Sequence, residues 1–174
     1  NPQQGNHYGK KALEIALNDS VKAKIVSSMA NNYLMISNFK EALSHYEEAL
    51  QIYKVIGDIE SEAKVTGNIG FYYFYLGDYG KSMDNQYKAL KIFESLDNKL
   101  GQANTLLALS SLFKEQKHFE EAMEHSNAAL KLFEDLSPED AEAIEIGTIR
   151  AVLCDNLGGL FIFMCRSEDA EKQL

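Results

Sequence analysis

The sequence contains no tryptophan, only two prolines and two cysteines, and no long apolar run. Because proline interrupts helices, its scarcity favours an almost entirely helical chain. The longest apolar stretch, around residues 69–76, is far too short to span a membrane. Cations are also scarce, since 17 Lys and Arg oppose 26 Asp and Glu, which gives a formal net charge of −9. This balance argues against binding to nucleic acid, whose backbone attracts clustered cations, and leaves basic or apolar partners open.

The two cysteines favour a reducing compartment. Cys154 and Cys165 lie in a segment that we expect to form one helix. At about 1.5 Å of rise per residue they would be roughly 16 Å apart, beyond the reach of a disulfide. Unpaired thiols indicate a cytoplasmic location, and no targeting segment is visible. We also expect the sequence to be a piece of a longer protein, because it begins without methionine and ends within a helical pattern.

A repeat of 40 residues is the dominant feature of the sequence. Turn segments recur at Asn38, Asp78 and His118. Each is preceded by a small residue and an aromatic residue and followed by an Ala-Leu pair. The equivalent positions are Ala30, Gly70 and Ser110; Tyr33, Tyr73 and Phe113; and Ala49, Ala89 and Ala129. The predicted organisation is a leading helix of an incomplete repeat (1–22), repeat 1 (23–62), repeat 2 (63–102), repeat 3 with the start of a long helix (103–150), and a partial repeat 4 (151–174).

Each repeat is predicted to contain two helices. Apolar residues in the second repeat recur at helical spacing from Val65 to Leu76. Gly77 then ends this helix, and the carboxylate of Asp78 caps a second helix over about residues 79–96. Asn38 can fill the same capping role in the first repeat. Stacking of neighbouring repeats is needed to bury the apolar faces, since one helix pair cannot form a core alone.

This pattern resembles the tetratricopeptide repeat. The matching positions are Gly70, Tyr73, Gly77, Asp78, Tyr79, Ser82, Ala89 and Leu90. The resemblance implies an all-α fold, a right-handed α-solenoid of stacked antiparallel helix pairs. The repeat departs from the family pattern of about 34 residues in its length and its lack of tryptophan. Lys54, Glu94 and Glu134 replace the closing proline. The longer spacing is similar to a signalling-type subgroup found in adaptors, kinesin light chains and peptide-sensing bacterial regulators.

The resemblance also implies that the first helix of each pair lines a concave, peptide-binding groove. Five aromatic residues occupy consecutive positions 71–75, and one helix cannot bury them all against its neighbours. By repeat position we expect Tyr72 and Tyr73 in the core and the other three facing the groove or the next repeat, although packing of all five between repeats is the alternative. The predicted groove residues are Asn31, Met35, Asn68, Phe71, Phe74, Tyr75, Asn104, Ser111 and Asn156. The asparagines can pair with a peptide backbone, or they can simply be solvated.

No enzyme motif is present, and no cofactor is implied. The sequence has neither a phosphate-binding loop nor a nucleophile elbow. Its carboxylates occur in helical runs that are typical of solvated faces. His118, Glu121 and His125 could share one helix face, but a turn position for His118 is the simpler interpretation than a metal site.

The predicted partner is a protein or peptide segment that is apolar or basic. Related arrays bind acidic tails through a two-carboxylate clamp, whose asparagines match Asn31 and Asn68. Its cationic positions are occupied here by Ser27, Asn104 and Ala108. We therefore expect a non-enzymatic peptide-binding scaffold within a regulatory or signalling protein. The alternative is a structural spacer or homo-oligomerisation array without a ligand in the groove.

Overall fold

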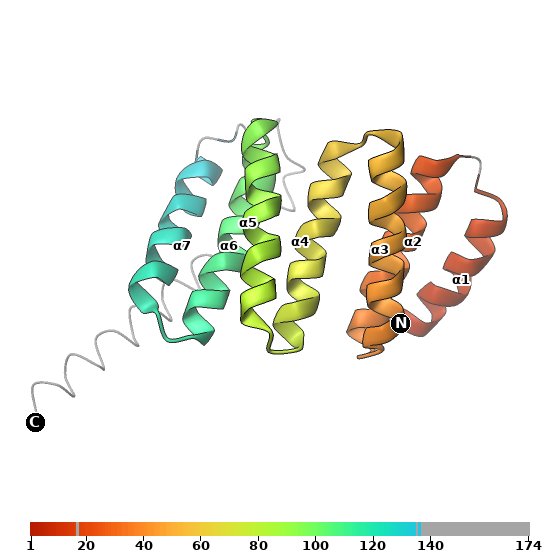
Figure 1. Cartoon of the computed structure of the whole chain (residues 1–174), viewed down its shortest axis with the longest axis horizontal. Coiled ribbons are helices and arrows are strands. Elements are labelled where there is room, and N and C mark those ends of the chain that lie inside the picture. Colours follow the sequence, from red (N-terminus) through yellow and green to blue (C-terminus); the bar gives the residue numbers. More distant parts are fainter. Residues whose placement is uncertain (17, 135, 137–174) are drawn as a thin grey trace, which may run out of the picture. The chain divides into compact units, whose positions relative to one another are not determined.

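The structure is a computed structural model that describes residues 1–16, 18–134 and 136. These residues form α-helices joined by short turns, and no strand occurs among them (Figure 1). The helices are α1 (Pro2–Glu14), α2 (Asp19–Met35), α3 (Phe39–Ile56), α4 (Ile59–Tyr75), α5 (Tyr79–Ser95), α6 (Lys99–Glu115) and α7 (Phe119–Glu134). The partial repeat 151–174, the long helix expected after Pro138, and the cysteines lie outside the described residues.

The 40-residue period of the sequence is present in the helices. The first helices of the three pairs begin at residues 19, 59 and 99, and the second helices begin at 39, 79 and 119. Each pair starts four residues before the repeat limits 23, 63 and 103 drawn from the sequence. One further helix, α1, precedes the first pair.

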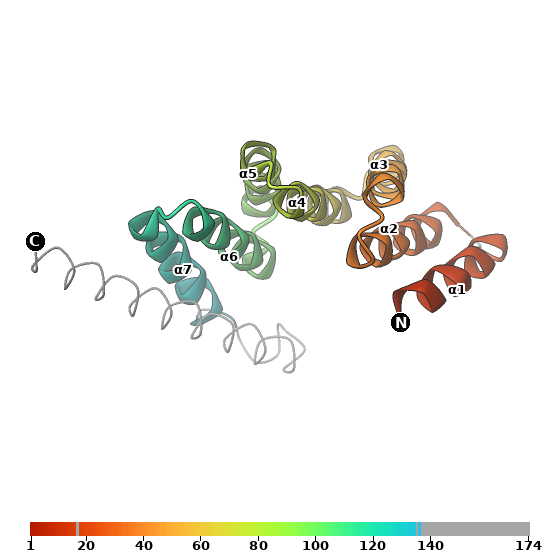
Figure 2. The same cartoon turned by 90° about the horizontal axis from the view of Figure 1, so that it is seen from below.

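The chain divides into two compact units, Asn1–Ile92 and Phe93–Leu174. In the first unit α2 packs between α1 and α3, as Figure 2 shows. The core of this unit combines small residues with tyrosines, which fill the spaces between closely approaching helices. Its buried members are Ala23, Val26, Ala30, Ala42, Tyr46, Ala49, Tyr53, Val65, Ile69 and Tyr72. In the second unit α6 packs on α7 around Ala103, Ala129 and Phe133.

The turn inside each helix pair requires a left-handed residue. Ser37, Gly77 and Lys117 occupy equivalent positions with φ of 57°, 74° and 63°. Only the second of these is glycine, the residue that adopts this conformation most readily. Asp78 then caps α5 as expected, because its Oδ1 accepts a hydrogen bond of 3.1 Å from the Lys81 N–H.

Asn38 does not perform the capping role that the sequence suggested. Its side chain makes no hydrogen bond at the start of α3. Asp78 is also paired with the Lys81 ammonium 2.8 Å away, whereas the equivalent residue of α3 is Glu41, which offers Asn38 no such contact. The backbone carbonyl of Asn38 still accepts the first helical bond, from Ala42 N at 3.0 Å.

Candidate functional site

The first unit brings together the predicted groove residues of two neighbouring first helices. Asn31 and Met35 lie on α2, and α4 carries Asn68 and the aromatic run 71–75. These two helices contact each other directly. Asn104 and Ser111 lie on α6 in the second unit, and Asn156 is outside the described residues. We use the name α2–α4 surface for Asn31, Met35, Asn68, Phe71 and Tyr75.

The five consecutive aromatic residues divide between core and surface. Tyr72 is buried, and Tyr73 packs against the same core. Phe71 is 42% exposed and Tyr75 is 66% exposed, so not all five rings pack between helices. Phe74 is half-buried, and its ring centroid lies 5.8 Å from that of Tyr79. Phe74 therefore supports the turn between α4 and α5, while Phe71 and Tyr75 are accessible.

A buried tyrosine holds one of the predicted asparagines. Tyr46 on α3 is only 1% exposed, and its hydroxyl donates a 2.5 Å hydrogen bond to Oδ1 of the exposed Asn31. Burial raises the pKa of Tyr46, and the nearby Tyr75 hydroxyl raises it further. The Tyr46 hydroxyl is therefore a donor at physiological pH. The sequence analysis did not identify Tyr46. One signal was available, because polar residues recur at the 40-residue spacing on otherwise apolar helix faces, at Tyr46, Gln86 and Ser126.

The same repeat position connects the two helices of each later pair. Nε2 of Gln86 donates to the Gly67 carbonyl at 3.1 Å, and the Ser126 and Ser110 hydroxyls are 2.7 Å apart. Asn6, the equivalent residue of α1, is buried, and its carboxamide has no hydrogen-bond partner among the described residues. The polar links fix each first helix against its second helix, and with it the side chains that the first helix exposes.

Serine hydroxyls add further hydrogen bonds between the two helices of the later pairs. In the second pair, Ser82 of α5 donates to the Gly70 carbonyl of α4 at 2.7 Å. In the third pair the direction is reversed, because Ser110 of α6 donates to the Ala122 carbonyl of α7 at 2.8 Å. The first pair has two alanines, Ala30 and Ala42, at the equivalent positions. Small residues thus occupy these positions in all three pairs, and in the later two a serine hydroxyl bonds across to the other helix.

Comparison with known families decides what these helix pairs are. Two tetratricopeptide repeat families match the sequence, one over residues 61–135 and the other over residues 23–56. The chain is a tetratricopeptide repeat protein. The predicted family and the predicted all-α repeat fold are both confirmed. Membership of the longer signalling-type subgroup stays a prediction. No curated protein sequence matches the chain.

Solved structures share the tetratricopeptide fold. BtubC (BKLC) from P. vanneervenii is 19% identical with a TM-score of 0.74, and the match covers 98% of this chain and 69% of that one. Aspartyl phosphate phosphatase F from Bacillus subtilis is 15% identical with a TM-score of 0.70, over 93% of this chain and 44% of the phosphatase. The apo form of RapI is 18% identical with a TM-score of 0.67, over 93% of this chain and 62% of RapI. The chain thus spans about half the length of the latter two proteins, and these identities show the fold alone.

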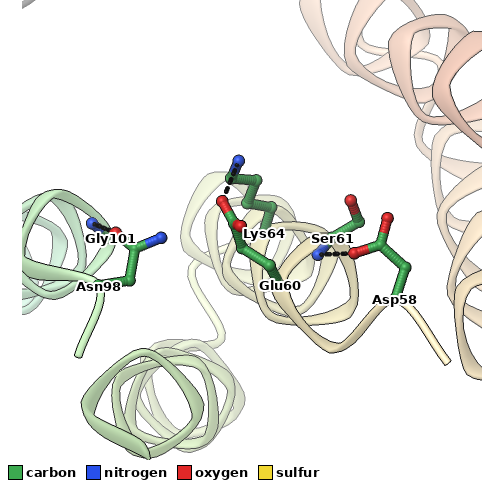
Figure 3. Close-up of polar contacts among 6 residues, drawn as sticks. All are labelled: Asp58, Glu60, Ser61, Lys64, Asn98 and Gly101. Atoms are coloured by element: carbon green, nitrogen blue, oxygen red, sulfur yellow. Dashed lines mark hydrogen bonds and ion pairs between the residues drawn. The ribbon is translucent and has the colours of Figure 1, made fainter. Parts of the chain in front are cut away.

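Charged residues of the tetratricopeptide repeats are engaged at helix ends. Asp58 caps α4 by accepting a 3.0 Å bond from the Ser61 N–H, and Glu60 pairs with Lys64 at 2.7 Å (Figure 3). The bond from Ser61 lowers the pKa of the Asp58 carboxyl, and the positive charges of Lys24 and Lys64 lower it slightly further. In the second unit Asn98 caps α6 in the same manner, at 2.7 Å from the Gly101 N–H.

The histidines of the third repeat take part in helix surface contacts. His125 lies 2.8 Å from the Glu121 carbonyl through Nδ1, and its ring centroid is 5.0 Å from that of Phe113. His118 also contacts Phe113, at 6.3 Å. Among the described residues, no group of three or more His, Cys, Asp or Glu side chains is arranged to hold a metal ion. Within the same part of the chain, no helix combines the length and the apolar character needed to cross a membrane.

Proposed function

We propose that this tetratricopeptide module binds an extended protein or peptide segment on the α2–α4 surface. The supporting observation is the exposure of large apolar side chains on adjacent first helices. Met35 is 74% exposed on α2, and Phe71 and Tyr75 are exposed on α4, which contacts α2. Neighbouring exposed apolar side chains favour docking of another molecule, and aromatic residues are frequent anchors at interfaces.

The polar members of the surface favour a peptide backbone as the ligand. The carboxamides of Asn31 and Asn68 can hydrogen-bond a main chain whatever its side chains are. The net charge of −9 favours apolar or basic segments over acidic tails. We therefore assign the module a non-enzymatic, cytoplasmic role as an interaction scaffold within a regulatory or signalling protein.

The proposal predicts that Met35→Ala weakens peptide binding without unfolding the chain. The probe is a random dodecapeptide library displayed on phage, from which the best binder of the wild-type chain is synthesised. Loss of one anchor from a small interface raises Kd by about 5- to 30-fold, corresponding to about 1–2 kcal/mol. Isothermal titration calorimetry measures this change. The matched control is Val55→Ala. Val55 is 73% exposed, close to the exposure of Met35, but it lies on α3, the second helix of the pair.

Two results would contradict the proposal. An equal loss of affinity in Met35→Ala and Val55→Ala would remove the binding site from the α2–α4 surface. Failure of every library peptide to bind would argue for the alternative role as a spacer or homo-oligomerisation array. Sedimentation velocity of the wild-type chain and Met35→Ala then tests that alternative, since self-association through this surface would be lost in the variant.

A further inference from the structure

The orientation of the Asn31 carboxamide determines what this residue can bind. Its Oδ1 already accepts the hydrogen bond from the Tyr46 hydroxyl. A carboxamide has one oxygen acceptor and two N–H donors, and Asn31 is exposed. With the oxygen engaged toward α3, the free hydrogen-bonding capacity of Asn31 lies mainly in its two N–H groups.

We infer that Tyr46 is a positioning residue that holds Asn31 as a hydrogen-bond donor, so that the site takes a backbone carbonyl of an apolar peptide segment. This inference rests on the proposed function and names what the site recognises. A carboxamide that rotates freely presents either its oxygen or its nitrogen to a ligand. The Tyr46 bond removes this choice, and it also lowers the conformational entropy that Asn31 would lose on binding.

The buried hydroxyl of Tyr46 can sustain this orientation. A carboxamide rotated by 180° would point its N–H groups at the Tyr46 oxygen and leave the hydroxyl proton without this acceptor. Burial and the neighbouring Tyr75 hydroxyl both oppose loss of that proton. An unsatisfied buried donor costs about 1–3 kcal/mol, so the observed orientation is the stable one.

The ligand carbonyl would lie next to apolar contacts. Met35 is one helical turn beyond Asn31 on α2 and is largely exposed. Tyr75, close enough to influence the Tyr46 hydroxyl electrostatically, is exposed on α4. A carboxylate ligand is disfavoured, because the net charge of −9 repels anions. The combination fits a peptide carbonyl flanked by an apolar side chain.

Equivalent positions of the other described repeats do not repeat this arrangement. Phe71 replaces Asn31 on α4, and Ser111 replaces it on α6. The Ser111 hydroxyl donates to the Leu107 carbonyl of its own helix at 3.1 Å. The Tyr46–Asn31 pair is therefore particular to the first repeat, and it would define the register of the bound peptide along the α2–α4 surface.

The test compares Tyr46→Phe with Tyr53→Phe in the intact chain. Both tyrosines are buried on α3, and each substitution removes one hydroxyl oxygen. The probe is the synthetic dodecapeptide selected on the wild-type chain. We expect Tyr46→Phe to raise Kd about fivefold, the effect of one weakened neutral hydrogen bond, and Tyr53→Phe to leave Kd unchanged. In the ligand-free chain, the NMR order parameter of the Asn31 side-chain NH2 should fall in Tyr46→Phe only.

A second variant tests the donor role directly. Asn31→Asp keeps an oxygen for the Tyr46 hydroxyl but has no N–H group, so it should bind the dodecapeptide at least fivefold more weakly. Peptides in which one backbone carbonyl at a time is replaced by a thioamide, a neutral and weaker hydrogen-bond acceptor, locate the carbonyl that Asn31 binds. One such peptide should lose affinity for the wild-type chain, and the same change should have little further effect in Asn31→Asp.

The outcomes separate this inference from the proposed function. If dodecapeptides bind the wild-type chain but Tyr46→Phe and Tyr53→Phe have the same Kd, the positioning role is wrong and the peptide site stands. Undiminished binding by Asn31→Asp would likewise overturn the donor role. If no dodecapeptide binds the wild-type chain, the peptide site itself is wrong, and the role of Tyr46 falls with it.

Discussion

At the scale of single residues, the packing of α4 against α5 depends on two glycines. Gly67 and Gly70 lie one turn apart on α4, and both face the buried Gln86 of α5. A Cβ at position 70 would lie 2.7 Å from Nε2 of Gln86, whereas at position 67 the nearest atom, Gln86 Oε1, is 3.6 Å away. The first distance requires movement of a hydrogen-bonded core residue, and the second is an ordinary contact.

Substitution of these glycines by alanine should therefore have opposite effects. Gly70→Ala is expected to lower the free energy of unfolding by about 1–3 kcal/mol, because Gln86 is displaced. Gly67→Ala is expected to raise it by up to about 1 kcal/mol, since alanine favours the helix. Urea denaturation of the two variants and the wild-type chain measures both changes. Stabilisation by Gly70→Ala would show that Gln86 adapts without cost.

At the scale of elements, the first helices share a capping device at the repeat spacing. Asn18, Asp58 and Asn98 each accept a hydrogen bond from a backbone N–H three residues on, in α2, α4 and α6. Asp58 is the one charged member of this set. Its lowered pKa reflects a carboxylate that is stabilised by the helix N-terminus.

The charge of Asp58 predicts a pH-dependent contribution to stability. Because its pKa is lower in the folded chain, the contribution is complete above the unfolded value of about 3.9 and is lost as pH falls through the folded value. Asp58→Asn should keep the capping hydrogen bond, as Asn98 does in α6, but it has no carboxyl group that titrates. Between pH 7 and pH 3, the wild-type chain should lose about 0.3–1 kcal/mol more stability than Asp58→Asn. If urea denaturation shows that the free energies of unfolding of the wild-type chain and of Asp58→Asn depend on pH in the same way, this prediction is wrong.

At the scale of the whole molecule, the acidic charge acts on every partner that approaches. A net charge of −9 attracts basic ligands over a distance set by ionic strength. Electrostatic attraction mainly accelerates association, so apolar contacts on the proposed α2–α4 surface would govern dissociation. The proposed site therefore predicts that net charge changes the association rate constant and that the apolar contacts change the dissociation rate constant.

This division can be measured with two versions of the selected dodecapeptide, extended by three lysines or by three glutamates. At low salt, the basic version should associate at least about tenfold faster, and the rates should converge in 0.5 M NaCl. Stopped-flow fluorescence anisotropy with a labelled peptide gives the association rates. Equal rates at low salt would mean that the net charge of the chain does not select its partner.

Much of the fold was predictable because its signals are local. The 40-residue spacing, the turn at Gly77 and the start of α5 follow from residues close together in sequence. The separation of Tyr72 from the exposed Phe71 and Tyr75 also followed from repeat position. By the same rule Phe74 was expected to face the groove or the next repeat, and its contact with Tyr79 across the turn was not foreseen because it depends on how the helices meet.

The sequence by itself determined the helices, their period and the family, since helical spacing, turn residues and small residues act over a few positions. Only the tertiary structure decided which polar groups meet across the helices. Tyr46 and Asn31 are 15 residues apart, and their hydrogen bond exists because α3 folds back along α2. Gln86 reaches Gly67 for the same reason. Such contacts depend on how the helices pack and how far the side chains reach, and the 40-residue spacing of the sequence reveals neither.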